Sequence, residues 1–331
     1  MRQPTRFSRR QFLGSTTAML AAGGYASSLW AAETGPLAAL RRRAAVHHRR
    51  LLVTDTEPST ARVLVGGHPW VYASTLPKND ITPVLPTIFA DMQYAGLDGI
   101  ELMSEVLHSK DTFEQIGELS QKHHLPIIGA SFGGSMCDRT KHAEILENAE
   151  LVITRLAKLG GRTLGTSVGS IKGKKTPEQF DAQADVLRKI IALGQANGIV
   201  LNLHNHTYEI ADDLYDLKGT MARIPDVKLG PDIGWLVRGG IDPVAFVHQF
   251  GRQIVFCHVR DQTAEKKWSE AVGEGVVDYP AIAKALREAG FHGDAVIELA
   301  FERGFTPTRP IRESFKISCQ FVRKLFDGKN A

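Results

Sequence analysis

Cysteine is scarce in this chain. Three cysteines, Cys137, Cys257 and Cys319, occur among 331 residues, and they form neither a CxxC pair nor the spacing of a zinc finger. The sequence therefore argues against a disulfide framework and against a cysteine-held zinc site. Because Cys257 lies within an apolar run, we interpret it as a small core residue.

A long apolar run and a phosphate loop are also missing. The apolar stretch of residues 15–30 contains glycine and serine and is too short for a stable membrane span. Residues 65–69 hold two glycines without the GxGxxG pattern, and Pro69 would disturb the helix N-terminus that a dinucleotide site needs. A doubly wound nucleotide-binding sheet, the alternative α/β fold, is therefore disfavoured.

Excess positive charge is confined to the N-terminus. The formal net charge is +4, but residues 1–32 contain four arginines and no acidic residue, so the remainder has 36 basic and 36 acidic side chains. A near-neutral remainder gives no electrostatic reason to expect a nucleic-acid partner.

The N-terminus has the pattern of an export signal. Ser8-Arg9-Arg10-Gln11-Phe12-Leu13 is a twin-arginine motif, and small residues lie near position 31 after the apolar stretch. These features predict a Tat signal peptide over residues 1–32, recognised by the Tat export machinery and removed from a periplasmic protein. Residues 33–60, with a basic run at 41–50, are predicted to form an N-terminal extension made of a solvated helix or linker.

Strand-like and helix-like segments alternate from residue 61 to the end of the chain. Eight such pairs in about 270 residues predict a single-domain (β/α)8 TIM barrel over residues 61–331. The expected strands are residues 61–67, 99–103, 126–132, 162–169, 200–206, 227–232, 254–260 and 294–300. The expected helices are residues 82–96, 111–124, 141–160, 176–198, 212–224, 242–251, 279–290 and 309–326.

Side-chain alternation along the later strands supports a barrel with a polar interior. Cys257 and Val259 alternate with His258 and Arg260, so the apolar set suits the side that faces the helices. The polar set then points into the barrel mouth, where TIM-barrel active sites lie. That polar set comprises Asn202, His204, His206, His258, Arg260 and Glu298.

Four of these apolar runs end in residues that can hold a metal ion. Residues 200–203 precede His204-Asn205-His206-Thr207-Tyr208-Glu209, and the next three runs lead to Asp232, His258 and Glu298. Three carboxylates and one imidazole form an oxygen-rich set that suits Mn²⁺ or Mg²⁺. Carboxylates in one pocket repel each other, and a divalent cation offsets that repulsion, so we expect a metal site.

Four motifs give the chain a resemblance to a known family. They are Leu97-Asp98-Gly99-Ile100-Glu101-Leu102, His204-Asn205-His206-Thr207-Tyr208-Glu209, Phe256-Cys257-His258-Val259-Arg260-Asp261 and Gly273-Glu274-Gly275-Val276-Val277-Asp278-Tyr279. Together they resemble the xylose isomerase-like TIM barrels, the sugar phosphate isomerase/epimerase superfamily, over about residues 60–325. The motifs are specific for the superfamily and say little about the substrate.

The resemblance implies a divalent metal, Mn²⁺ first and otherwise Mg²⁺, Co²⁺ or Zn²⁺, held by Glu209, Asp232, His258 and Glu298. The sequence departs from the epimerases at two places. They have a glutamate at the position of His204, so the fifth-strand ligand is expected to be Glu209, with His204 as its rival. They also have histidine where this chain has Trp235, which puts their substrate contacts in doubt here.

The expected reaction is proton abstraction next to a sugar carbonyl. A bound metal stabilises the enediolate, and Glu209 or Glu298 removes the proton. His206 is the candidate for moving the second proton, because an imidazole titrates near neutral pH. Further candidate substrate-binding residues are His204, Arg260, Trp235, Glu101 and His68.

Three outcomes fit the same site. Proton return gives an isomerase or epimerase, whereas loss of a β-leaving group gives a lyase that acts on 3-keto-glycosides. A non-catalytic periplasmic sugar-binding barrel is the rival of a different class, while an endonuclease IV-type hydrolase needs more metal ligands than the chain offers. Since phosphorylated sugars are cytoplasmic, the export signal predicts an unphosphorylated carbohydrate substrate. The sequence leaves the sugar and the oligomeric state open.

Overall fold

The computed structural model describes residues 62–327. The predicted signal peptide and the whole of the predicted N-terminal extension lie outside the described residues. Among the helices of residues 62–327, none has the length and apolar character needed to cross a bilayer.

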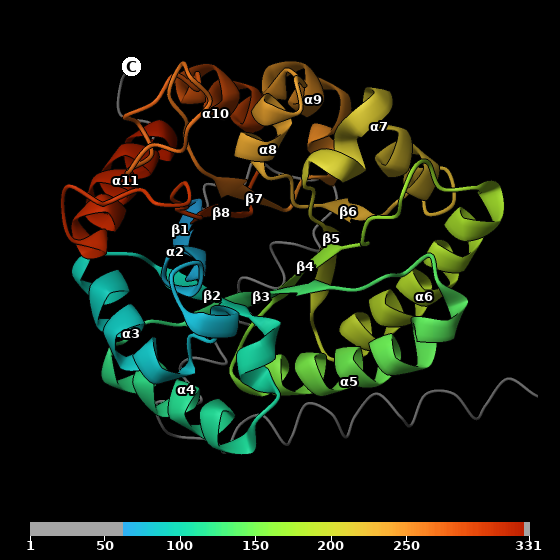
Figure 1. The fold of residues 1–331 in the computed structure, drawn as a ribbon, viewed down its shortest axis with the longest axis horizontal. Coiled ribbons are helices and arrows are strands. Elements are labelled where there is room, and N and C mark those ends of the chain that lie inside the picture. Colours follow the sequence, from blue (N-terminus) through green and yellow to red (C-terminus); the bar gives the residue numbers. More distant parts are fainter. Residues whose placement is uncertain (1–61, 328–331) are drawn as a thin grey trace, which may run out of the picture. The chain divides into compact units, whose positions relative to one another are not determined.

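Eight parallel strands form the centre of the described chain, and helices surround them (Figure 1). The strand order is β6-β5-β4-β3-β2-β1-β8-β7, so β1 to β6 pair in sequence order, β7 pairs with β8, and β1 pairs with β8. Between β6 and β7 only single bridges occur, at Leu229–Ile254 and Asp232–His258, which makes the barrel nearly closed. The strands are β1 Leu64–Gly67, β2 Gly99–Met103, β3 Ile127–Gly133, β4 Thr163–Ser167, β5 Val200–Leu203, β6 Lys228–Leu229, β7 Phe256–Val259 and β8 Asp294–Ile297.

The predicted (β/α)8 fold is therefore confirmed. Each predicted helix has a counterpart, although boundaries differ by several residues. The structure adds two short helices after strands, α2 Trp70–Ala73 and α8 Ile233–Arg238. The remaining helices are α3 Leu85–Tyr94, α4 Lys110–Lys122, α5 His142–Lys158, α6 Pro177–Ala196, α7 Thr207–Met221, α9 Pro243–Phe250, α10 Tyr279–Glu288 and α11 Ile311–Phe326. Short 3₁₀ turns lie at Pro77–Asn79, Thr82–Val84, Ser104–Leu107, Arg139–Lys141 and Gly251–Gln253.

Two apolar clusters reflect the two faces of the strands. The larger one packs the outer face against the helices and includes Leu203, Cys257 and Ile297. The smaller one contains Ile128, Val200, Val255, Phe256 and Val296. A Cβ at Gly66 would contact both Ile128 of β3 and Val296 of β8, so these side chains meet inside the barrel. The predicted alternation therefore holds for Cys257 and Ile297 against Phe256 and Val296, but not for Val255, which precedes β7 and belongs to the smaller cluster.

Helix α7 begins earlier than the sequence suggests. Its first turn starts at Thr207, and the backbone N–H of His206 donates to the Glu209 carboxylate at 2.7 Å. This contact is half of a capping box. Residues 211–214 then leave helical geometry, with Asp212, Asp213 and Leu214 all at positive φ, before the helix resumes. The first turn of α7 is thus a separate feature at the barrel mouth.

Candidate metal centre and active-site cavity

A cavity of about 310 Å³ opens at the C-terminal ends of the strands. Its volume falls within the range of ligand pockets in proteins, which starts at roughly 300 Å³. One part of its lining is aromatic and aliphatic, and the other part is polar. The lining residues are His68, Trp70, Met103, Glu105, Ser131, Phe132, Gly133, Gly165, Ser167, His204, His206, Trp235, His258, Arg260 and Glu298.

Three side chains that could hold a metal ion converge beside this cavity. One ligand atom from each of His204, Asp232 and His258 lies within 4.8 Å of the others, the one group of this kind among residues 62–327. The same three residues contribute buried polar atoms that lack a hydrogen-bond partner, namely His204 Nδ1, Asp232 Oδ2 and His258 Nδ1. Because buried polar atoms are rarely left without a partner, this convergence fits a divalent cation.

Two further charged side chains, Glu298 and Arg260, contact His258 and Asp232. Glu298 Oε2 lies 3.0 Å from His258 Nδ1, and Arg260 Nη2 lies 2.5 Å from Glu298 Oε2 and 3.0 Å from Asp232 Oδ2. The contacts of His258 Nδ1 and Asp232 Oδ2 are ion pairs without hydrogen-bond alignment, so both atoms keep an unused lone pair or proton. One guanidinium therefore lies between two carboxylates that could also hold a metal.

Burial and neighbouring charges determine the ionisation of Asp232, Glu298 and His204. Burial raises the pKa of Asp232, and the nearby Arg260 charge opposes this only in part. Burial also acts on Glu298, but Arg260 and His258 outweigh it and hold the pKa of Glu298 well below its ordinary range. Burial, reinforced by the charge of His258, holds the pKa of His204 well below 6.5. His204 is therefore neutral, the form in which an imidazole binds a metal.

Glu101 on β2 supports His258 from the barrel interior. Its Oε2 lies 2.5 Å from His258 Nε2, and Glu101 is only 1% exposed. Burial alone would lower the pKa of His258, but Glu101 and Glu298 raise it to about 10. Sequence analysis placed Glu101 among the substrate-binding candidates, whereas the structure places its carboxylate against His258. Glu101 is absent from the cavity lining.

Aromatic rings hold Arg260 in place. Its guanidinium carbon lies 5.5 Å from the Trp235 ring centre and 5.0 Å from that of Trp268. A Cβ at Gly234 would lie 2.2 Å from Arg260 Cγ, so the glycine allows the arginine to cross α8 closely. Arg260 is 3% exposed. Arg260 is therefore a fixed charge at the cavity rather than a mobile one.

His206 and Glu209 lie together on one wall of the mouth. His206 lines the cavity, and its Nδ1 lies 3.5 Å from Glu209 Oε2. The other Glu209 oxygen accepts a hydrogen bond from Ser167 Oγ at 2.6 Å. Glu209 is 3% exposed and lies outside the converging group of His204, Asp232 and His258. The residues His206-Thr207-Tyr208-Glu209 have the spacing of a capping box, which was not recognised in the sequence. In this motif the Glu209 carboxylate accepts a hydrogen bond from the first residue of the motif, at the start of the helix.

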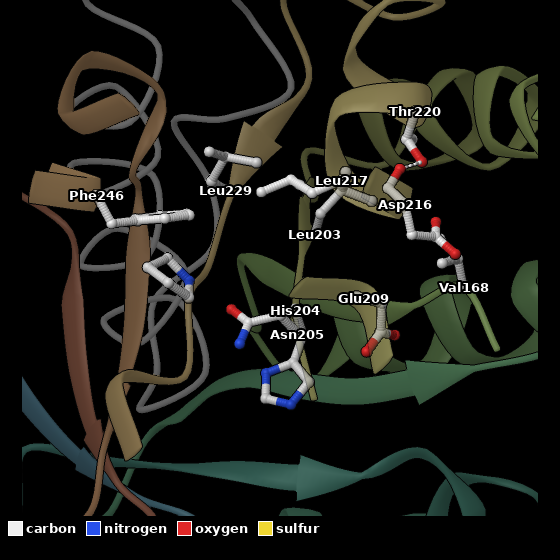
Figure 2. A pocket seen from close by; sticks show the side chains of 11 residues that line it. Val168, Leu203, His204, Asn205, Glu209, Asp216, Leu217, Thr220, Leu229 and Phe246 are labelled. Atoms are coloured by element: carbon white, nitrogen blue, oxygen red, sulfur yellow. Dashed lines mark hydrogen bonds between the residues drawn. The ribbon is translucent and has the colours of Figure 1, made fainter. Parts of the chain in front are cut away.

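Figure 2 shows the residues that line a second, much smaller cavity, which shares His204 with the first one. Its volume is about 10 Å³, and its polar lining includes Glu209 and Asp216 from α7 and His204 and Asn205 from the end of β5. A space of this size holds at most about one water molecule, so the larger cavity is the candidate substrate site. Asp216 also accepts from Lys175 Nζ at 2.6 Å, a buried pair that joins the β4–α6 loop to α7.

The motif that contains His258 and Asp261 is hydrogen-bonded to the glycine-rich motif of residues 273–279. The Asp261 carboxylate accepts the backbone N–H groups of Gln262, Gly273, Gly275 and Val277 at 2.8–3.2 Å. A Cβ at Gly275 would lie 2.2 Å from Asp261 Oδ1, which explains the glycine. The loop thereby fixes the chain that follows β7.

The structure brings most of the predicted site residues to one place. His204, His206, His258, Arg260, Glu298, Trp235 and His68 all line the cavity, and the fully buried Asp232 lies next to His204 and His258. Three residues that shape the site were not predicted from the sequence. They are Ser131, which contacts His68; Ser167, which contacts Glu209; and Asn205, which pairs with the Asp232 backbone.

Comparison with known proteins gives consistent matches. The model of the family described as xylose isomerase-like TIM barrel matches residues 89–325. Inosose dehydratase of Lacticaseibacillus casei is 23% identical over 63% of this chain and 79% of its own length. Among solved structures, 3-keto-D-glucoside 4-epimerase from E. coli superposes with a TM-score of 0.62 at 16% identity, over 80% of this chain and 100% of that one. D-allulose 3-epimerase from Methylomonas sp. in complex with D-allulose also gives 0.62 at 16% identity, over 80% and 98%.

Proposed function

Because the chain belongs to the xylose isomerase-like TIM barrel family, we propose that it is a divalent-metal-dependent isomerase or epimerase of an unphosphorylated sugar or keto-sugar. The observation that carries the proposal is the convergence of His204, Asp232 and His258 beside the 310 Å³ cavity, each with a buried polar atom that makes no hydrogen bond. A sugar-binding barrel without catalysis would not need such a set.

The proposed site holds the cation on His204, Asp232 and His258, with Glu298 next to His258 as the fourth candidate. When bound, the cation supplies Lewis-acid stabilisation of the negative charge that develops on the substrate's oxygens. Arg260 supplies a second fixed positive charge beside Glu298. Glu209, the ligand expected from the family resemblance, is engaged by Ser167 and by the His206 backbone instead.

Proton transfer is assigned to two groups that face the cavity. Glu298 accepts the proton from the carbon next to the carbonyl, so that the C–H bond breaks and its electrons form the enediolate. His206 delivers a proton to the same carbon in epimerisation or to the neighbouring carbon in isomerisation. Glu209 lies 3.5 Å from His206 Nδ1 and stabilises the imidazolium that carries this proton.

The cavity walls suit a carbohydrate ring. Trp70 and Trp235 both line it, and aromatic faces pack well against the C–H surface of sugars. The solved D-allulose 3-epimerase complex, which has the same fold, contains a sugar. We propose that the sugar substrate of this chain is unphosphorylated. The N-terminal twin-arginine pattern indicates export from the cytoplasm, where phosphorylated sugars are found.

A lyase is the second candidate. Inosose dehydratase is among the sequence relatives, and dehydration breaks a carbon–oxygen bond. In this reaction the same α-proton is removed, but the electron pair then expels a leaving group from the β-carbon. The leaving group takes the proton that His206 would otherwise return to carbon. A 3-keto-glycoside would therefore lose its aglycone.

Incubation in D₂O separates these outcomes. The purified full-length protein is loaded with metal and mixed with free sugars, 3-keto-sugars and 3-keto-glycosides, and the products are examined by NMR and mass spectrometry. Deuterium next to the carbonyl supports proton abstraction, and a new stereoisomer or a released aglycone selects between the two candidates. Sugar binding without exchange or product across the panel would favour a binding protein instead.

We also propose that the protein is exported to the periplasm through the Tat pathway. The proposal rests on the Ser8–Leu13 motif. Replacement of Arg9 and Arg10 by lysine is expected to retain the protein in the cytoplasm, as measured by fractionation. Periplasmic accumulation of that double variant would contradict it.

A further inference from the structure

We infer that His204 shifts the metal preference of this site toward Zn²⁺ or Co²⁺ and away from Mg²⁺ and Mn²⁺. The inference rests on the proposed metal site and makes His204 its specificity-determining residue. From the sequence, Mn²⁺ is the expected ion because Glu209, a carboxylate, is taken as the fifth-strand ligand. With His204 as that ligand, Mn²⁺ is no longer the preferred ion.

The first argument is the donor set. The three converging residues contribute two imidazoles and one carboxylate. Neither histidine Nδ1 makes a hydrogen bond, although His258 Nδ1 lies 3.0 Å from Glu298 Oε2. Imidazole nitrogen suits zinc, iron, nickel and copper, whereas Mg²⁺ and Mn²⁺ prefer carboxylate, carbonyl and water oxygens. Two histidines with one carboxylate is also a known ligand set of catalytic zinc sites.

The second argument is the charge around that set. The guanidinium of Arg260 lies 3.0 Å from Asp232 Oδ2 and 2.5 Å from Glu298 Oε2, and both carboxylates are buried. Hard cations depend on the summed negative charge of their oxygen ligands. Since Arg260 neutralises part of that charge, the site is weakened for Mg²⁺ more than for an ion that bonds to nitrogen.

The third argument is the position of Glu209. Its two oxygens accept hydrogen bonds from Ser167 Oγ at 2.6 Å and from the His206 backbone N–H at 2.7 Å. The residue is buried in the first turn of α7 and lies outside the converging group. His204, which directly follows β5, occupies the place in that group where a fifth-strand carboxylate would add charge.

The test compares affinity ratios, because nearly every site with nitrogen ligands binds Zn²⁺ more tightly than Mn²⁺. Chelator-stripped full-length protein is titrated calorimetrically with Zn²⁺, Co²⁺, Mn²⁺ and Mg²⁺. The same titrations are made on His204→Glu, His204→Gln and Glu209→Gln. Circular dichroism and thermal melting show whether each variant is folded.

His204→Glu is expected to move the Zn²⁺-to-Mn²⁺ affinity ratio toward Mn²⁺ by about tenfold or more, since one nitrogen ligand becomes an oxygen ligand. His204→Gln is expected to lose more Zn²⁺ affinity than Mn²⁺ affinity, and this variant decides the question if His204→Glu does not fold. Glu209→Gln is expected to keep the ratio of the unaltered protein.

An unchanged ratio in the folded His204 variants, or a ratio that changes only in Glu209→Gln, would overturn the inference while leaving the metal site intact. If the unaltered protein bound none of the four ions, the proposed metal site and this inference would both fail.

Discussion

Glu101 Oε2 and His258 Nε2 lie 2.5 Å apart in the barrel interior, although the two residues are 157 positions apart in sequence. The contact occupies Nε2, which leaves Nδ1 as the ring nitrogen without a hydrogen bond, 3.0 Å from Glu298 Oε2. A carboxylate behind a metal-binding imidazole is a common way to fix its orientation and raise its basicity.

Removal of Glu101 should therefore weaken metal binding without removing a ligand. We expect Glu101→Ala to lower metal affinity by roughly 10–100-fold, and Glu101→Gln to lower it less because the amide oxygen still accepts from Nε2. Titration calorimetry measures the effect. Glu114→Gln, at an exposed carboxylate on α4, is the matched control. Equal affinities of Glu101→Ala and the control would show that this contact does not support the metal site.

The stability of the metal-free protein should fall as the solution becomes alkaline. The pKa of His258 is raised from 6.5 to about 10. A raised folded-state pKa contributes stability that is complete below pH 6.5 and is lost as the pH rises through 10. Melting temperatures across this window should therefore fall for the metal-free protein, and less for the metal-saturated protein, whose His258 is already neutral. An equally steep fall in His258→Gln would assign the effect to other groups.

His206 is expected to act in proton transfer and not in metal binding. We expect His206→Gln to slow deuterium exchange into the substrate by about 100-fold or more, which is the lower range for loss of a general acid or base. Metal affinity should stay unchanged, because His206 lies outside the converging group. His248→Gln, an exposed histidine on α9, controls for general effects of the replacement. Loss of metal affinity in His206→Gln would instead indicate a structural or ligand role.

The buried pair of Lys175 and Asp216 should matter for stability. Their charged atoms lie 2.6 Å apart, with side-chain exposures of 2% and 11%. Lys175→Met leaves Asp216 uncompensated, and we expect a loss of about 3–5 kcal/mol in the free energy of unfolding. Urea denaturation measures this loss, and the double variant Lys175→Met/Asp216→Leu should recover part of it. A double variant no more stable than the single one would contradict the explanation.

Gly275 should tolerate no side chain. Its Cβ would lie 2.2 Å from Asp261 Oδ1 and 2.3 Å from the Gln262 carbonyl oxygen. We expect Gly275→Ala to cost about 1–3 kcal/mol in the free energy of unfolding, the usual range for overpacking. Gly117→Ala is the matched control, because its Cβ meets only an ordinary contact at 3.6 Å within α4. Equal stabilities of the two variants would show that the loop shifts at little cost.

The barrel could be predicted because its signals are local. Most strands are short, largely apolar runs such as Val200–Leu203, and the helices between them carry caps and periodic apolar faces. Thr176 and Gln179, for example, form a capping box at the start of α6. Because successive side chains of a strand point to opposite faces of the sheet, the sequence was enough to place His258 and Glu298 on the inner face.

The choice between His204 and Glu209 was not local, and their spacing alone left both open. The structure separates them because Glu209 is drawn to the start of α7 by His206 and Ser167, whereas His204 lies at the end of β5 beside Asp232 and His258. The position of Arg260 between two carboxylates likewise depends on Trp235, Trp268 and Gly234, which come from separate segments.

The sequence by itself determined the order of strands and helices, the inward direction of the polar residues and the chemistry available at the mouth, because periodicity and capping act between near neighbours. Only the tertiary structure decided which of those residues meet. Barrel closure brings β2 to β7 and β5 to β6, and the resulting distances follow from contacts between residues that are far apart along the chain.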